Sequence, residues 1–256
     1  MPDSVLIVPA AGLGTRLQAS TPKILVPVNG RPIVDHLLDL YGSTVERFVL
    51  VLHPSFERLV RHHCAQRPLA IEYVLQDHPT GMLDAILSAR TQVRAANPSR
   101  VWITWCDQIG IEPKTIQTLK RLSDEHPRTA LIFPTSTHTN PYIHIVRDPA
   151  GRIIDILHRR EGDVLPSVGE SDMGLFSLAP DAYFDSLPEF ARAAAAGRAT
   201  RERNFLPAIA WLSRRGAEVR TFPCVDAREA IGINTPDDLR TIEHYLRERG
   251  GAVTSA

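Results

Sequence analysis

The chain has 256 residues, enough for one large domain or two small ones, and 43% of them are hydrophobic, which supports a sizeable core. Lysine plus arginine and aspartate plus glutamate each number 29, so the formal net charge is zero. This balance indicates no polyanion-binding surface and argues against a nucleic-acid-binding protein.

The sequence contains no run of eighteen apolar residues, and its first residues lack the basic and apolar regions of a secretory signal peptide. The cysteines, Cys64, Cys106 and Cys224, are odd in number and far apart, which fits neither a disulfide framework nor a metal-binding pair. We therefore expect a cytoplasmic protein that makes no membrane contact.

Strand-like and helix-like segments alternate through the first half of the chain. Short apolar runs predict strands at residues 5–8, 48–52, 71–75, 101–105 and 130–133. Apolar residues at helical spacing predict helices at residues 32–40, 56–64, 82–93 and 113–122. The alternation predicts an α/β fold, with a Rossmann-like, mostly parallel mixed sheet and helices on both of its faces.

The second half has a different pattern, with strand-like pieces at residues 142–146, 153–157 and 174–178. A turn sequence at residues 148–151 predicts that the first two form a hairpin, within a small β-rich layer. The remaining segments are predicted as helices at 190–199 and 204–214, a strand at 219–222 and a closing helix at 235–249. Thr235 is a suitable N-cap for that last helix.

The stretch after the first strand is dominated by small residues: Ala10-Ala11-Gly12-Leu13-Gly14-Thr15-Arg16. Such a loop can hold its N–H groups against phosphate oxygens, and Arg16 and Lys23 add charges suited to phosphate. Glycines alone would be as typical of an ordinary strand-to-helix turn. Leu17 stands where a dinucleotide fingerprint needs a third glycine, and no Gly-Lys-Ser/Thr sequence closes a Walker loop. The combination indicates a phosphate site of another kind.

Polar residues follow two later strands and precede the closing helix. Gln76 could offer a donor and an acceptor to a pyrimidine edge, and Gly81 could let the backbone approach the base. Asp107 could bind Mg²⁺, which prefers one or two carboxylates with water and phosphate, or it could be a turn aspartate. Asn234 could supply an oxygen to the same metal or simply mark the helix entry. Because ligands bind at the carboxyl ends of parallel strands, we expect one shared site.

Together these pieces resemble the sugar nucleotidyltransferases, most closely the uridylyltransferase domain of N-acetylglucosamine-1-phosphate uridylyltransferases. The resemblance runs from Val5 to about Leu246 and rests on the loop above and on Pro22-Lys23, Val74-Leu75-Gln76, Gly81, Asp107 and Gly232-Ile233-Asn234. No repeat or linker divides the chain. We predict a single domain over residues 1–250, with a nucleotide-binding half at about 1–135, an acceptor-binding half at about 136–234, the closing helix at 235–249 and a tail at 251–256.

The resemblance implies a role for each position. Ala10, Ala11, Gly12, Gly14 and Thr15 would hold a nucleoside triphosphate, and Gln76 and Gly81 would recognise a pyrimidine. Arg16 and Lys23 would be catalytic and meet the phosphates, and Asp107 and Asn234 would bind Mg²⁺. His158 and Asp172 align with acceptor-binding positions, where the family has a glutamate and an asparagine.

The implied reaction joins a nucleoside triphosphate, UTP or CTP, to a sugar 1-phosphate and releases pyrophosphate. Residues 158–172 depart from the sugar-binding pattern, so a cytidylyltransferase acting on a non-sugar phosphate or phosphonate is the alternative. The presence of Lys23 and Asp107 disfavours a non-catalytic, nucleotide-binding regulatory homologue. A glycosyltransferase is disfavoured because its Asp-x-Asp motif is absent where Asp107 stands alone. The oligomeric state stays open.

Overall fold

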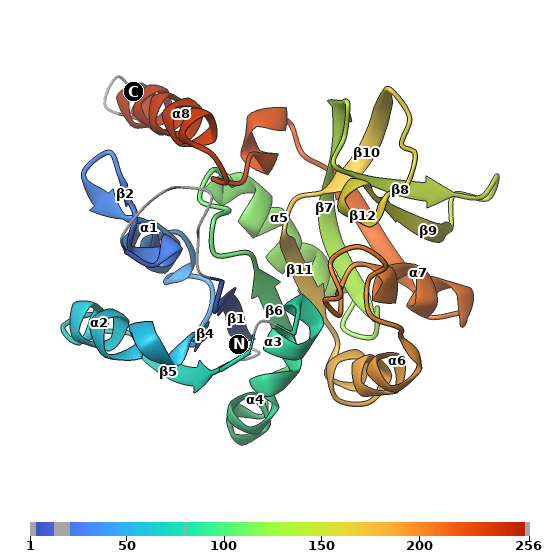
Figure 1. Cartoon of the computed structure of the whole chain (residues 1–256), viewed down its shortest axis with the longest axis horizontal. Helices are drawn as coiled ribbons and strands as arrows, with labels where there is room; N and C mark the ends of the chain where they lie inside the picture. The colour runs from blue at the N-terminus through green and yellow to red at the C-terminus, as the bar shows by residue number, and fades with distance from the viewer. Residues whose placement is uncertain (1–3, 13–20, 79, 254–256) are drawn as a thin grey trace.

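An eight-stranded sheet crosses the centre of the molecule with helices on both faces (Figure 1). The structure is a computed structural model that describes residues 4–12, 21–78 and 80–253, the last three by their backbone alone. The strand order is β10-β7-β11-β6-β1-β4-β5, and β12 also pairs with β7. The predicted α/β, Rossmann-like fold is confirmed.

The strands take up short apolar runs, as the sequence predicts. Their bounds are β1 (Ser4–Ala10), β2 (Pro27–Val28), β3 (Arg31–Pro32), β4 (Arg47–Leu52), β5 (Ala70–Leu75), β6 (Arg100–Thr104), β7 (Leu131–Thr139), β8 (Ile143–Arg147), β9 (Ile153–His158), β10 (Val168–Asp172), β11 (Leu175–Leu178) and β12 (Val219–Pro223).

The helices alternate with these strands. Their bounds are α1 (Ile33–Tyr41), α2 (Pro54–Cys64), α3 (Met82–Ser88), α4 (Arg90–Ala96), α5 (Pro113–Glu125), α6 (Leu187–Ala193), α7 (Pro207–Arg214) and α8 (Pro236–Val253). None of the helices in the described part of the chain has both the length and the apolar character that crossing a bilayer requires.

Strand direction decides which loops meet. β1 pairs in parallel with both β4 and β6, and β4 pairs in parallel with β5, so these four strands end at the same edge of the sheet. In the second half of the chain, β11 runs antiparallel to β6 and β7, and β10 runs antiparallel to β7. The β-rich second half thus extends the same sheet.

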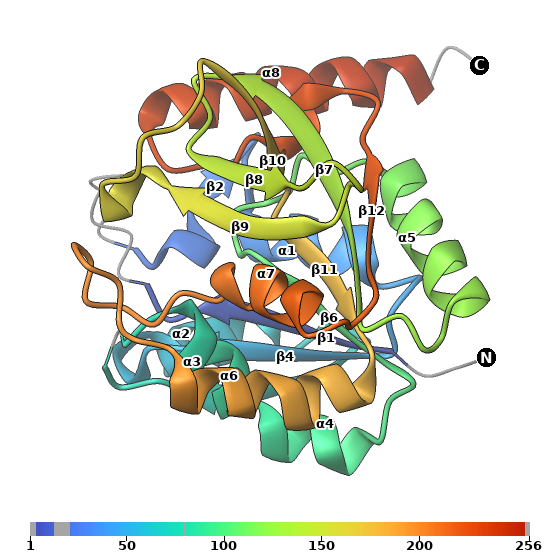
Figure 2. The same cartoon turned by 90° about the vertical axis from the view of Figure 1, so that its right-hand side faces the viewer.

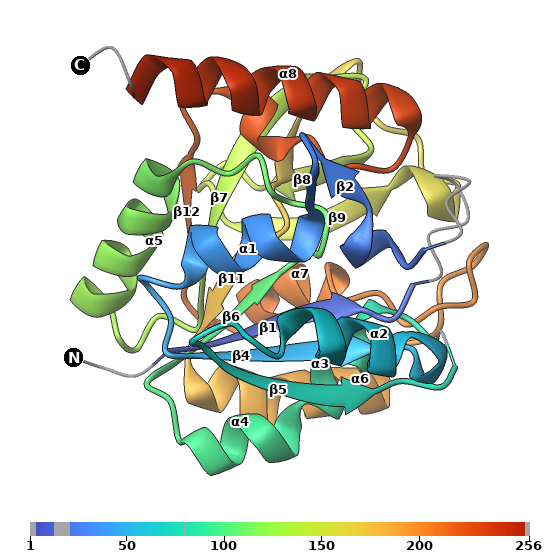
Figure 3. The same ribbon diagram turned by 90° about the vertical axis from the view of Figure 1, so that its left-hand side faces the viewer.

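The core lies on both faces of the sheet because successive strand residues point to opposite sides. In β1, Val5 and Ile7 join one apolar cluster with α3, α4, α6 and α7. Leu6 and Val8 join the other cluster with α1, α2, α5 and α8. Figure 3 shows α1, α5 and α8 along that second face. Burial on both faces explains why the central strands are continuous apolar runs.

The predicted hairpin at residues 142–157 is confirmed as the antiparallel pair of β8 and β9. The Asp148 carboxylate accepts hydrogen bonds from the N–H groups of Ala150 and Arg152, which fixes the turn between the strands. The hairpin packs against α7 and beside β10, where Figure 2 shows it as a separate yellow and green layer. It covers the end of the sheet built by the second half of the chain.

Two helix predictions were wrong in extent. The helix expected at residues 82–93 is divided into α3 and α4 at Ala89, where the hydroxyl of Ser88 donates to the Ala85 carbonyl at 2.7 Å and competes with the helical ladder. The helix expected at 190–199 follows a π-helical turn, Ala182–Ser186, and ends at Ala193. The residues beyond it form a loop instead. β10 was not predicted.

Candidate active site

The carboxyl edge of the sheet brings together the loops that the sequence singled out. β1 ends at Ala10, with Ala11 buried and Gly12 exposed just beyond it. Gln76 follows β5 directly, and Asp107 lies three residues after β6. Since these strands are parallel, their ends share one edge, as the sequence predicted. Gly14, Thr15 and Arg16 lie outside the described residues.

Lys23 joins the two predicted metal-binding residues, Asp107 and Asn234. It opens a 3₁₀ turn, Lys23–Leu25, and its Nζ forms an ion pair with Asp107 Oδ2 and donates to Asn234 Oδ1 at 3.1 Å. The side chains of Lys23 and Asp107 are only 15% and 11% exposed. A carboxylate oxygen and an amide oxygen from distant parts of the chain therefore converge on one cation.

The entry of α8 holds Asn234 in place. The Ile233 N–H donates to the Asp107 carbonyl at 3.4 Å, so this segment runs against the strand end. Thr235 caps the helix, accepting from the Asp238 N–H at 3.2 Å, as the sequence predicted. The Asp238 carboxylate accepts in return from the N–H groups of Asn234 and Thr235. This reciprocal cap satisfies helix-end donors and fixes the backbone that carries the amide.

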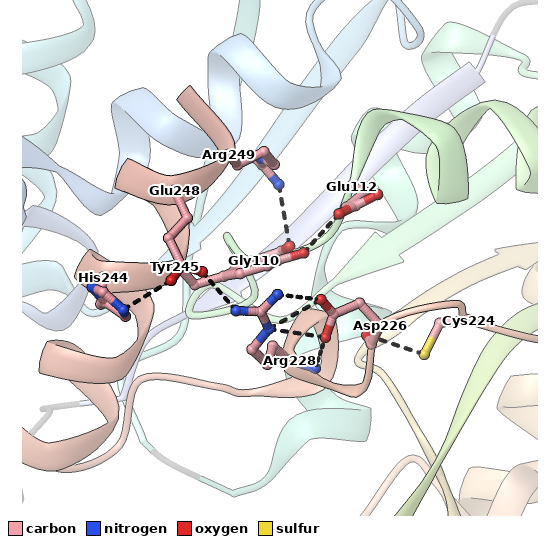
Figure 4. A network of polar contacts seen from close by, with 9 residues as sticks. All are labelled: Gly110, Glu112, Cys224, Asp226, Arg228, His244, Tyr245, Glu248 and Arg249. Atoms are coloured by element: carbon pink, nitrogen blue, oxygen red, sulfur yellow. Dashed lines mark hydrogen bonds and ion pairs between the residues drawn. The ribbon is translucent and has the colours of Figure 1, made fainter. Parts of the chain in front are cut away.

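The later turns of α8 are tied to the segment after Asp107 (Figure 4). The Tyr245 hydroxyl donates to Glu112 Oε1 at 2.9 Å, and Arg249 donates to the carbonyls of Gly110 and Ile111 at 3.3 and 3.1 Å. Arg228 lies over the Tyr245 ring, 4.6 Å from its centroid. Asp107 and Asn234 are thus held by elements that are bonded to each other.

The environment of Asp107 is buried and polar. Gln108 is 6% exposed, and its Nε2 donates to the Ala230 carbonyl at 3.4 Å. Its Oε1 is buried with no hydrogen-bond partner among the described residues. Burial, reinforced by the neighbouring Asp107 charge, raises the pKa of Cys106 to about 12. Burial therefore favours the protonated thiol at neutral pH.

Gln76 and Gly81 form a turn between β5 and α3. The Gln76 amide donates to the Gly81 carbonyl at 3.3 Å and to the Thr80 hydroxyl at 3.4 Å. Gly81 has φ 126°, and a Cβ there would lie 2.5 Å from the carbonyl oxygen of Arg203. The sequence suggested that this glycine makes room for a base. In the structure, its missing side chain makes room for the backbone of Arg203.

His158 and Asp172 lie in one neighbourhood. His158 is paired across the hairpin with Ile143, whose carbonyl accepts from the Ser171 hydroxyl at 2.5 Å, next to Asp172. Asp172 Oδ2 accepts from the Gly174 N–H at 2.9 Å, and Gly174 in turn accepts from the Trp105 N–H. Asp172 is therefore close to the end of the strand that leads to Asp107.

Burial changes the ionisation of both residues. It lowers the pKa of His158, so the neutral imidazole is favoured. It raises the pKa of Asp172 to about 6, against the lowering effect of the hydrogen bond from the Gly174 N–H. Among the described residues no cation forms an ion pair with Asp172. A ligand that donates a hydrogen bond to Asp172 would therefore stabilise its ionised carboxylate.

Comparison with known proteins places this arrangement in a family. The profile of the MobA-like NTP transferase domain matches residues 6–204. The chain belongs to the MobA-like NTP transferase family. It is therefore a nucleotidyltransferase, and the resemblance to sugar nucleotidyltransferases is confirmed.

Curated relatives of this NTP transferase include several bifunctional GlmU proteins. That of Enterococcus faecalis is 26% identical across 97% of this chain and 53% of the relative. That of Rhodospirillum rubrum is 27% identical across 100% and 57%, and that of Listeria innocua is 27% identical across 95% and 52%. The chain thus spans about half the length of the curated relatives it matches.

The matched range of the NTP transferase domain runs from β1 to residue 204 and stops before α7. It includes Lys23, Gln76, Gly81 and Asp107 but not Asn234. The Lys23–Asn234 hydrogen bond therefore joins the matched domain to the last part of the chain.

Sequence reasoning missed the loop at residues 197–204. Several charged residues of the segment 158–163 pair with this loop. Arg198 forms an ion pair with Asp163, and Arg160 lies 3.8 Å from Glu202. Gly197, which interrupts the alanine-rich run, was the available signal for a loop.

Proposed function

We propose that this NTP transferase joins UTP or CTP to a sugar 1-phosphate and releases pyrophosphate. The observation that carries the proposal is the convergence of Lys23, Asp107 and Asn234 at the carboxyl edge of a parallel sheet. Phosphate-binding sites in open α/β sheets occur at this edge. Family membership supports the nucleotidyl transfer, and the quoted sequence motifs support the pyrimidine nucleotide and the sugar phosphate.

The donor set around Lys23 fits Mg²⁺. Asp107 offers a carboxylate oxygen and Asn234 an amide oxygen to the same point, and both are hard oxygen ligands of the kind that Mg²⁺ takes. The described residues contain no cluster of three or more acidic, histidine or cysteine ligands, which suits an ion that completes its shell with water and phosphate. When bound, Mg²⁺ would neutralise charge on the triphosphate.

Lys23 would bind the phosphates once it leaves its present partners. Its ammonium and the guanidinium of Arg16 would balance the charge that moves toward the leaving pyrophosphate. Backbone N–H groups of residues 10–15 would bind phosphate oxygens. A phosphate oxygen of the acceptor attacks the α-phosphorus in line, and the bond between that phosphorus and pyrophosphate breaks. No general base is needed, because a phosphate monoester loses its second proton with a pKa of about 6. The protein contributes position and charge.

The base and the acceptor would lie on either side of this centre. Gln76 and Gly81 would meet the pyrimidine, and an amide can turn to suit either uracil or cytosine. His158 and Asp172 would meet the acceptor. Because residues 158–172 depart from the sugar-binding pattern, a non-sugar phosphate or phosphonate is the second candidate acceptor.

A pyrophosphate-release screen tests the proposal. Purified full chain with MgCl₂ is given each of UTP, CTP, dTTP, ATP and GTP against sugar 1-phosphates, phosphocholine and phosphonates. We expect release with a pyrimidine triphosphate and a sugar 1-phosphate. Release only with phosphocholine or a phosphonate would select the second candidate. No release with any pair, together with binding of a triphosphate, would support the non-catalytic, nucleotide-binding homologue instead.

A further inference from the structure

The loop at residues 197–204, here called the bridging loop, contacts both sides of the proposed site. It connects α6 to α7 and is not helical, although the alanine-rich sequence before it predicts a helix to residue 199. A loop that overrides strong helix propensity must be held by contacts outside itself. Those contacts are on the turn at residues 76–81 and on residues 158–163, the charged segment.

The first anchor is the backbone of Arg203. Its N–H donates to the Thr80 carbonyl at 2.7 Å, and its carbonyl accepts from the Leu83 N–H at 3.0 Å. These two bonds enclose Gly81, and any side chain at Gly81 would collide with the Arg203 backbone. The bridging loop is therefore part of the wall of the turn that carries Gln76.

The side chain of Arg203 strengthens this anchor. Its Nη2 lies 2.7 Å from Asp84 Oδ1, and its Nη1 donates to the Ala191 carbonyl at 2.8 Å. Asp84 is in the first turn of α3 and Ala191 is in α6. One residue thus connects the turn at 76–81, the start of α3 and the helix that precedes the bridging loop.

The second anchor is the carboxylate of Glu161 in the charged segment. Oε2 accepts from the Ala199 N–H at 2.9 Å and from the Thr200 N–H at 3.4 Å. Oε1 accepts from the Thr200 hydroxyl at 2.5 Å and from the Asn204 amide at 3.0 Å. Partial desolvation opposes ionisation of Glu161, but these bonds outweigh it and lower its pKa to about 2. The carboxylate is saturated by the loop.

The bridging loop itself is short and internally bonded. The Gly197 N–H donates to the Glu202 carbonyl at 2.8 Å, and the Arg201 N–H donates to the Gly197 carbonyl at 3.1 Å. A Cβ on Gly197 would lie 2.6 Å from the Glu161 Cδ, so a glycine is needed for this close approach. The loop is therefore one internally bonded unit that contacts both anchors.

We propose that the bridging loop couples the turn at residues 76–81 to the charged segment, so that binding of a nucleoside triphosphate and positioning of the acceptor reinforce each other. Arg203 and Glu161 are the positioning residues of this coupling. The inference rests on the proposed function, which places the nucleotide at the turn that carries Gln76 and the acceptor at His158, in the charged segment, and at Asp172. Coupling between two ligand sites is reciprocal and typically changes affinity by about 5- to 150-fold.

Hydrogen–deuterium exchange on the full chain tests the coupling without a known acceptor. Mg²⁺ with UTP, and separately with CTP, serves as the probe. In the wild-type chain we expect slower exchange at residues 76–83 when the nucleotide binds. We also expect about 5-fold slower exchange at residues 158–163, although this segment need not touch the nucleotide. Protection at 76–83 without any change at 158–163 would overturn the inference while leaving the proposed function intact. No protection anywhere with either triphosphate would count against the proposed function.

Variants identify the route. Glu161→Gln replaces one acceptor oxygen by an NH₂ group, which cannot accept the hydrogen bonds that the bridging loop donates. Nucleotide-dependent protection at residues 158–163 should therefore be lost, while protection at residues 76–83 is kept. Thr200→Val removes one hydroxyl donor to Glu161 at nearly constant volume and should also reduce the nucleotide-dependent protection of residues 158–163. This second variant keeps the test valid if Glu161→Gln folds poorly. Glu189→Gln, an exposed acid paired with Arg215, is the matched control and should behave as the wild type. Full protection of 158–163 in both loop variants would refute the assigned route.

Discussion

Charged groups are used differently at the sheet edge and in the charged segment. At the sheet edge, Lys23 contacts the ends of two side chains, Asp107 and Asn234, that come from the β6 and α8 ends of the fold. In the charged segment, Glu161 accepts backbone and side-chain hydrogen bonds from a loop that is itself closed. The first set consists of side-chain contacts alone, whereas the second includes two backbone N–H donors and so fixes the position of the loop backbone.

This difference shows that density of charge along a sequence does not locate the contacts with a ligand. Residues 158–163 are rich in charge, but their carboxylates stabilise the position of the bridging loop. Lys23 is a single cation in an apolar stretch, and its partners are polar side chains that could instead hold a metal or release the ammonium to a phosphate. Side-chain contacts at the end of a strand, such as those of Lys23, indicate a ligand-binding position better than a high density of charge along the sequence does.

The largest effect should come from Asp107. Asp107→Asn removes the one carboxylate at the converging point, so we expect turnover to fall by at least about 10²-fold, as when preorganised charge is lost from a transition state. The rate of pyrophosphate release at saturating substrates measures this. The thermal midpoint should stay near that of the wild type. Near-normal turnover of the variant at limiting Mg²⁺ would show that Asp107 does not bind the metal. The difference drawn between the sheet edge and the charged segment would then be wrong.

Lys23 should follow closely. Lys23→Ala removes a cation placed to balance charge on the leaving pyrophosphate, and we expect kcat to fall by about 10²–10³-fold. Lys120→Ala is the control, because Lys120 only pairs with Asp124 one turn along α5. Unchanged kinetics for Lys23→Ala would mean that its two contacts are structural, like those of Glu161.

A smaller and more selective effect is expected at Asp172. Asp172→Ala should raise the KM of the acceptor several-fold, because a carboxylate without a cationic partner among the described residues is available to a hydrogen-bond donor. The KM of the triphosphate should be almost unchanged. Steady-state kinetics with one substrate varied at a time separates the two. Weaker triphosphate binding in the variant would place the acceptor site elsewhere.

The smallest effect concerns stability and pH. Burial raises the pKa of Asp172 from its usual value of 3.8 to about 6, so the fold favours the protonated carboxyl. This favourable contribution is complete below pH 3.8 and is lost as the pH rises through 6. Asp172→Asn, which cannot ionise, should therefore gain thermal stability relative to the wild type between pH 4 and pH 8. A difference that does not change with pH would show that the carboxylate is solvated in the folded chain.

The sequence predicted the fold well because its strongest signals are local. The apolar runs of β1, β4 and β6 are buried on both faces, and Thr235 caps α8 as expected. The shared edge of Gln76 and Asp107 followed from strand direction alone. The roles of Gly14, Thr15 and Arg16, and the extent of the domain, stay predictions.

The bridging loop could not be predicted because its cause is tertiary. Four alanines before Gly197 favour a helix. Residues 199–204 nevertheless form a loop, because they donate hydrogen bonds to Glu161, which lies 38 to 43 positions earlier in the sequence. The same holds for Gly81, whose neighbour Arg203 lies more than a hundred positions away in the sequence. No local pattern encodes such pairs.

Lys23 and Asn234 are 211 positions apart, so the converging point forms only when both ends of the chain are present. During synthesis the N-terminal part emerges first, and β1, β4, β5 and β6 can assemble before α8 exists. A nascent chain can therefore hold most of its sheet while it still lacks the amide that completes the site. A premature stop before residue 234 would yield a chain without this contact and without the apolar face of α8, and catalytic competence would be among the last properties that the growing polypeptide acquires.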